Sequence, residues 1–130
     1  MKSKSTLFAV TLASAFLAQP MMAEAKTLSG NDIKQKISGK KVLLQTRWGN
    51  FPLRYRTNAR VTGDGSALGL AKFFAPKETG RWWVANNRLC QKFPTWYKGQ
   101  TSCFSLRSTG PNRLSWVRQD GASGTAVISR

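Results

Sequence analysis

Residues 81–93 read RWWVANNRLCQKF, and this stretch indicates the fold of the chain. Two short runs rich in apolar residues flank Asn86 and Asn87, and adjacent asparagines favour a tight turn because asparagine tolerates positive φ. Residues 81–85 and 88–93 are therefore expected to pair as antiparallel strands. Trp82 and Trp83 are neighbours on a strand, so one should enter a core and the other should face outward.

The same pattern of short apolar runs and turn residues continues on both sides. Residues 51–61 alternate between apolar and polar positions, Gly63-Asp64-Gly65 predicts a hairpin turn, and residues 76–80 predict a second turn. The expected strands cover residues 42–48, 51–61, 67–75, 81–85, 88–93, 101–107, 113–118 and 125–129. About eight short strands at such spacing predict a mainly β fold, a small antiparallel up-and-down barrel.

One short helix is expected before the strands, over residues 29–39 (SGNDIKQKISG). Ser29 or Asn31 can cap its first turn, and Asp32 suits the positive end of the helix dipole. Ile33 and Ile37 form one apolar stripe, and glycine at position 39 is a natural stop.

The first 25 residues have the pattern of a secretory signal. A basic start precedes the apolar run LFAVTLASAFL, and Ala23-Glu24-Ala25 fits the small-x-small cleavage rule. The apolar run is too short for a transmembrane helix, which needs about 20 apolar residues. We expect a signal peptide at residues 1–25, one domain at residues 26–130 without a transmembrane segment, and a periplasmic or secreted location.

The chain has two cysteines, Cys90 and Cys103. In an exported protein such a pair most simply forms a disulfide, which in the chain-entropy model contributes about 3 kcal/mol for a loop of this length. A catalytic thiol or a metal pair is the weaker alternative, because no histidine or further cysteine is present to complete such a site.

The charge balance favours a binding protein over an enzyme. Lysine and arginine number 21 against 5 acidic residues, the net charge is +16, and histidine is absent. Ser-His and Cys-His catalysis is therefore excluded, and acid–base work would fall to four scattered carboxylates in the mature chain. These are Asp32, Asp64, Glu78 and Asp120. Local structural roles suffice for them, so we expect no catalytic residue, no metal site and no cofactor.

Arginines on one strand are the leading candidates for ligand contact. Arg54, Arg56 and Arg60 share one face of the alternating stretch, and arginine favours bidentate contact with phosphate or carboxylate. Other arginines flank the remaining strands at positions 47, 81, 88, 107, 113 and 118. The simpler interpretation is a solvated outer face. If the face pointed inward, it would line an anion-binding cavity.

Five tryptophans are many for this length, and core packing explains most of them. Trp96 lies beside Pro94 and Tyr97 in the loop between the cysteines, which makes it the best candidate for an exposed aromatic residue. Trp83 is a supporting candidate. Aromatic side chains beside basic ones suit contact with sugars, membrane interfaces or single-stranded nucleic acid.

Several motifs together resemble a known group of proteins. They are Leu28-Ser29-Gly30-x-x-Ile33, Ser38-Gly39-Lys40, Asp64-Gly65-Ser66, Gly80-Arg81-Trp82, Leu89-Cys90, Trp96, Cys103-Phe104 and Asp120-Gly121. Their order resembles small exported proteobacterial envelope proteins of unknown function with a calycin-like (lipocalin-like) β-barrel. The resemblance implies the fold and the compartment and transfers no catalytic residue.

These observations predict a non-catalytic binding protein for an anionic envelope component, such as lipopolysaccharide or an acidic polysaccharide. The expected partners are an anionic polymer or lipid head groups, and nucleic acid stays open because charge alone does not separate these anions. The alternative is a protein-interaction module, an envelope chaperone, inhibitor or adhesin, that docks to an acidic partner protein. A secreted enzyme is a third and weaker class.

Overall fold

The structure is a computed structural model that describes residues 3, 5–6, 9–15, 26–66 and 77–130. Most of the expected leader and the strand expected at residues 67–75 lie outside this range. Within it, no helix is long and apolar enough to cross a membrane.

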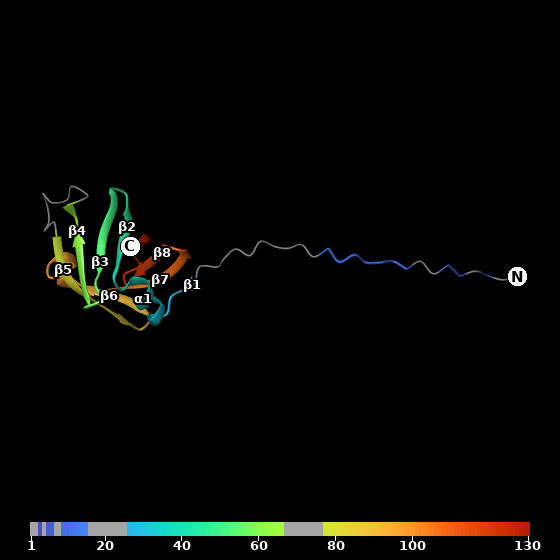
Figure 1. The fold of residues 1–130 in the computed structure, drawn as a ribbon, viewed down its shortest axis with the longest axis horizontal. Coiled ribbons are helices and arrows are strands. Elements are labelled where there is room, and N and C mark those ends of the chain that lie inside the picture. Colours follow the sequence, from blue (N-terminus) through green and yellow to red (C-terminus); the bar gives the residue numbers. More distant parts are fainter. Residues whose placement is uncertain (1–2, 4, 7–8, 16–25, 67–76) are drawn as a thin grey trace.

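The fold is mainly β, with a closed antiparallel barrel and one short helix, as the sequence predicts (Figure 1). Its eight strands are β2 (Lys40–Thr46), β3 (Gly49–Tyr55), β4 (Arg60–Asp64), β5 (Lys77–Ala85), β6 (Arg88–Lys92), β7 (Ser102–Gly110), β8 (Arg113–Arg118) and β9 (Ser123–Ser129). Each strand pairs with the next, and β9 pairs with β2 to close the sheet. A two-residue strand, β1 (Lys26–Thr27), pairs with the C-terminal half of β7.

The prediction of one strand over residues 51–61 is wrong, because a turn divides it. β3 ends at Tyr55 and β4 begins at Arg60, with Ala59 at φ 66° between them. Trp82 stabilises this turn from β5, since its backbone N–H donates to the Ala59 carbonyl and its indole N–H to the Arg56 carbonyl, both at 2.9 Å. Alanine rarely adopts positive φ, so the local sequence does not predict this turn.

Two expected turns are also wrong. Gly63 and Asp64 lie within β4, where Gly63 pairs with Leu53 on one side and Glu78 on the other. β5 begins at Lys77, so most of the turn expected at residues 76–80 is strand. β4 therefore ends later and β5 begins earlier than expected, because cross-strand pairing continues through these residues.

The helix α1 (Gly30–Ile37) covers one end of the barrel, at the bottom of Figure 1. Ser29, not Asn31, is the N-cap: Ser29 Oγ accepts from the Asp32 N–H at 3.2 Å, and the Asp32 carboxylate accepts from the Ser29 N–H at 3.1 Å. Ile33 and Ile37 are fully buried. The apolar stripe therefore closes this end of the barrel.

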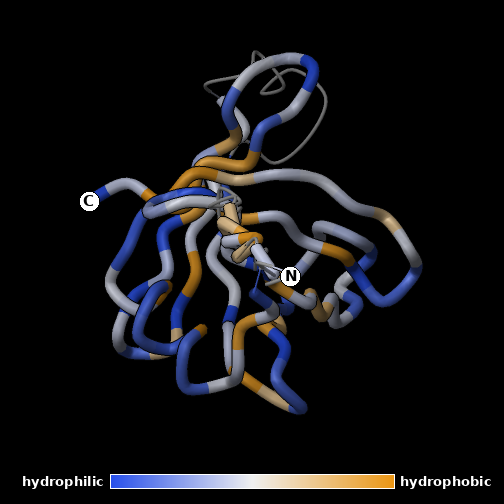
Figure 2. The backbone as a smooth tube through the Cα atoms, turned by 90° about the vertical axis from the view of Figure 1, so that its right-hand side faces the viewer, coloured by the Kyte–Doolittle hydropathy of each residue, from blue (hydrophilic) through white to orange (hydrophobic). Residues whose placement is uncertain are grey.

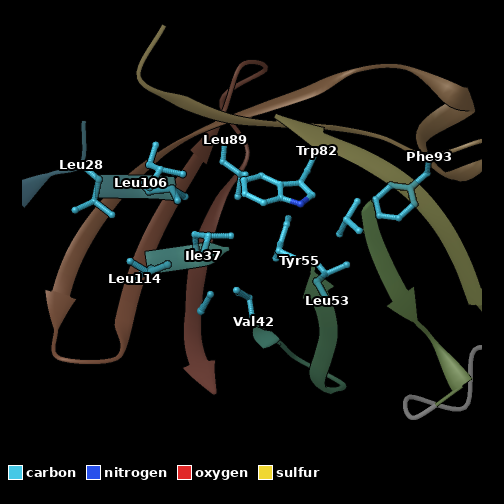
Figure 3. Packing of buried hydrophobic residues seen from close by; sticks show 13 residues of the cluster. Leu28, Ile37, Val42, Leu53, Tyr55, Trp82, Leu89, Phe93, Leu106 and Leu114 are labelled. Carbon is cyan, nitrogen blue, oxygen red and sulfur yellow. The ribbon is translucent and has the colours of Figure 1, made fainter. Parts of the chain in front are cut away.

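Hydrophobic and hydrophilic residues alternate along the strands, as the changing colours of the tube in Figure 2 show. The buried hydrophobic residues form one cluster inside the barrel. Figure 3 shows Trp82, Tyr55, Leu89 and Ile37 converging on the barrel axis from several strands and from α1.

Two tryptophans lie over glycines, and each needs the space that the missing side chain leaves. A Cβ at Gly63 would lie 2.4 Å from the Trp96 ring, and a Cβ at Gly124 would lie 2.6 Å from the Trp116 ring. Gly63 and Gly124 are therefore part of the packing of the interior.

Cys90 and Cys103 form the expected disulfide between directly opposed positions of β6 and β7, with Cα atoms 4.0 Å apart. The bond closes the loop that carries Trp96 and the short 3₁₀ helix η3 (Trp96–Gly99). A stable disulfide is typical of an oxidising compartment.

We predict that Gly124→Ala lowers the free energy of unfolding by about 1–3 kcal/mol, because the new methyl group displaces the Trp116 ring. Gly110→Ala is the matched control, since its Cβ would meet Arg113 at an ordinary 3.6 Å. Urea unfolding of both variants provides the measurement. Equal stability of the two variants would contradict this account of the Trp116 packing.

Candidate functional site

The barrel interior offers little space for a ligand. The cavity among its apolar side chains has a volume of about 40 Å³, room for a few water molecules at most. Inside, the Tyr55 hydroxyl donates to Gln91 Oε1 at 2.7 Å, and burial raises the pKa of Tyr55 so that this proton stays in place. An acyl chain or a sugar does not fit this volume.

The three arginines of the sequence prediction lie on the outside of the barrel. Arg54 alternates with buried Leu53 and Tyr55 on β3, Arg56 follows the end of that strand, and Arg60 opens β4. All three are exposed. The alternative in which they face inward is wrong, since the interior positions on these strands belong to the core.

Cross-strand register extends these arginines into a larger basic surface. Arg60 is directly opposite Arg81 on β5, and Arg81 is directly opposite Lys92 on β6. On the other side, Arg54 is opposite Lys41 of β2. We call Arg54, Arg56, Arg60, Arg81 and Lys92 the outer cationic face. Like charges in direct cross-strand register destabilise a sheet, so this face is a candidate site for a bound anion.

The carboxylates of residues 26–66 and 77–130 are all engaged away from this face. Asp32 caps α1, Asp64 lies 3.7 Å from Lys77, and Asp120 forms a bidentate pair with Arg118. The remaining one, Glu78, points into the barrel mouth. In these ranges no ion pair involves a residue of the outer cationic face.

Trp83 borders this face on β5, two positions beyond Arg81. It is 38 % exposed, whereas its neighbour Trp82 is buried, as the alternation predicts. Trp83 lines a groove of about 510 Å³ with Lys34 of α1 and with Thr57 and Ala59 of the β3–β4 turn. An indole beside a lysine at the edge of an arginine cluster can contact a sugar ring while the cations bind its acidic substituents.

A second, smaller groove lies between the cations themselves. Arg60, Arg81 and Lys92 line a hollow of about 290 Å³, with Thr79 and Pro94 among its other walls. The register sets these three cations directly opposite one another on adjacent strands, so this is a position at which one phosphate or carboxylate could meet more than one cation.

Trp96 does not belong to this surface. The expectation that it is exposed is wrong, because it is half-buried. Its ring packs edge-on against Phe51, with ring centroids 5.6 Å apart, and at a tilt against Phe93, with ring centroids 4.8 Å apart. Trp96 therefore closes the barrel mouth at the end opposite α1. In the same loop, Tyr97 is the exposed aromatic residue.

Glu78 holds this loop in place. Its carboxylate accepts hydrogen bonds from the Thr95 hydroxyl at 2.6 Å, from the Trp96 N–H at 3.0 Å and from the Thr95 N–H. Burial raises the pKa of Glu78, but these hydrogen bonds outweigh burial, and the net pKa lies below the usual 4.5. Glu78 is therefore ionised and structural.

Sequence reasoning did not single out Arg81, Lys92 and Lys34 for this surface. Arg81 and Lys92 join it only through cross-strand register, and Lys34 only through the packing of α1 on β5. The alternation at Arg81 could have indicated its outward direction but not its partner.

Within the described part of the chain, no cluster of three or more His, Cys, Asp or Glu side chains is arranged to hold a metal ion. No protein-family model, no curated protein and no solved structure matches the chain.

We predict that Glu78→Gln lowers the free energy of unfolding near neutral pH by about 2 kcal/mol, because it weakens charge-assisted hydrogen bonds. Because the pKa of Glu78 is lower in the folded state, its charge contributes fully to the free energy of unfolding above the unfolded pKa of about 4.5. This contribution is lost as the pH falls through the folded-state pKa. Urea unfolding between neutral pH and pH values below the folded pKa should therefore show the two proteins converging in acid. A constant difference across this range would contradict the role of the Glu78 charge.

Proposed function

We propose that this protein is an exported, non-catalytic binding protein for an anionic envelope component, which it holds on the outer cationic face. The ligand class is a phosphorylated or uronate-bearing glycan, such as lipopolysaccharide or an acidic polysaccharide. The compartment rests on the leader pattern of residues 1–25 and on the Cys90–Cys103 disulfide.

The observation that carries the proposal is the register of Arg60, Arg81 and Lys92. Three cations stand opposite one another on adjacent strands about 4.8 Å apart, and no carboxylate within residues 26–66 and 77–130 pairs with them. A polyanion removes this repulsion and supplies the missing acceptors. Arginine forks fit phosphate and carboxylate geometry, which favours these groups over a diffuse negative surface.

Trp83 and its groove favour a glycan over a bare polyphosphate. The exposed indole is directly opposite Cys90, so the disulfide to Cys103 fixes the strand across from it. A rigid aromatic surface next to cations gives apolar contact that salt does not screen.

We predict that replacing Arg54, Arg56 and Arg60 together with glutamine lowers affinity for purified lipopolysaccharide about tenfold or more, because three exposed contacts are each worth about 0.5–1 kcal/mol. The matched control replaces Lys36, Arg88 and Arg113, which removes the same charge outside this face. Tryptophan fluorescence titration, with thermal unfolding as the check on folding, provides the measurement.

Salt separates a shaped site from general attraction. The same titration with charge-matched DNA at low and high salt should show binding to lipopolysaccharide that survives salt and binding to DNA that does not. Equal affinities of the two triple variants, or equal salt sensitivity of the two ligands, would refute the proposed site.

A further inference from the structure

Two exposed aromatic side chains, those of Trp48 and Tyr97, lie at the same end of the barrel, whereas the exposed Trp83 lies on β5 near α1. The up-and-down strand order places the β2–β3, β6–β7 and β8–β9 connections at the end opposite α1. Trp48 in the first connection is 64 % exposed and Tyr97 in the second is 54 % exposed. The turns at the α1 end instead carry polar residues such as Asn58, Asn87 and Asn112. The turns at the two ends of the barrel therefore differ in chemistry.

Trp48 is held outward at the tip of the β2–β3 hairpin, which ends at the top of Figure 1. The Thr46 hydroxyl donates to the Gly49 carbonyl at 2.7 Å and accepts from the Trp48 N–H at 3.2 Å, so the tip is ordered. The Arg47 guanidinium lies 4.4 Å from the Trp48 ring centroid. The hairpin thus presents an indole and a cation together.

Tyr97 is presented by a backbone that is costly to form. Tyr97 and Lys98 have φ values of 54° and 57°, in the left-handed region that residues with a Cβ rarely adopt. The Glu78 hydrogen bonds to Thr95 and Trp96 anchor the preceding residues. The Arg118 guanidinium lies 5.0 Å from the Tyr97 ring centroid. A second aromatic residue with nearby cations is therefore fixed at this end.

We propose that this end docks onto the surface of an anionic lipid bilayer, with Trp48 and Tyr97 at the level of the head groups and with Arg47 and Lys98 near the lipid phosphates. Tryptophan and tyrosine favour the membrane–water interface, and basic residues are attracted to anionic leaflets. The hairpin tip, residues 45–50, has no carboxylate, and Asp120 at this end is neutralised by Arg118.

A membrane fits this end better than a protein partner does. The two aromatic residues project from separate turns, and protein interfaces concentrate their binding energy in one contiguous, well-packed patch. A fluid lipid bilayer can take up the Trp48 and Tyr97 side chains at two separate positions. This site is distinct from the outer cationic face and does not rest on the proposed function.

The test uses vesicles of equal parts phosphatidylcholine and phosphatidylglycerol, without lipopolysaccharide, and a parallel set with brominated acyl chains that quench nearby tryptophans. Wild-type protein should bind by co-sedimentation and show quenching. Trp48→Ala should lose the quenched fraction, and Trp48→Ala with Tyr97→Ala should lower vesicle affinity about tenfold or more. Asn112→Ala is the control, an exposed residue in a turn at the α1 end of the barrel that should change neither readout.

Each result decides the proposal. The variant with Arg54, Arg56 and Arg60 replaced should retain the Trp48-dependent quenching, which separates this site from the outer cationic face. Quenching and affinity that are unchanged in Trp48→Ala would overturn the proposal. Binding that persists in the double variant and vanishes in the arginine variant would assign membrane attraction to the cationic face instead.

Discussion

The ladder between β2 and β9 closes the sheet, and the placement of every candidate side chain depends on it. Val42 to Ile128 and Leu44 to Ala126 are opposed across this seam, so the apolar alternates of all eight strands meet inside. Closure turns one face of the sheet inward and the other to water, and none of the lysines and arginines of the described residues is buried. A basic chain folded in this way displays its cations on the outside, and register alone decides which of them become neighbours.

Hydrogen bonds with buried residues of β5 hold the β3–β4 turn and the β6–β7 loop in place. Trp82 donates two hydrogen bonds to the turn between β3 and β4, and this positions Arg56 and Arg60. Glu78 accepts hydrogen bonds from the loop after β6, and this positions Trp96 in the mouth and Tyr97 outside it. The cationic face and the aromatic end are each held by a residue of β5 that does not itself belong to the candidate surface.

The barrel, the helix and the disulfide could be predicted from the sequence, because alternation, an N-cap serine and a single pair of cysteines are local or compositional signals. It was insufficient for the turn at Ala59, whose positive φ depends on hydrogen bonds from distant Trp82. The burial of Trp96 depends in the same way on the space above Gly63, which lies far from it in the sequence. Alternation grouped Arg54, Arg56 and Arg60 on one face but left open whether that face points inward or outward. The opposition of Arg60 and Arg81 is a matter of register, which no local pattern specifies.

The filled interior has a consequence for binding kinetics. Within the described residues, tryptophans packed over Gly63 and Gly124 leave no interior chamber that could enclose a ligand, so a ligand of the outer cationic face would lie in grooves that are open to water. Individual contacts there break and reform quickly, because nothing must open for a ligand to leave. A long residence time then requires several contacts along one polymer, or several protein molecules on it, through effective concentration. Such a protein would exchange readily along a repetitive polymer and leave short fragments rapidly.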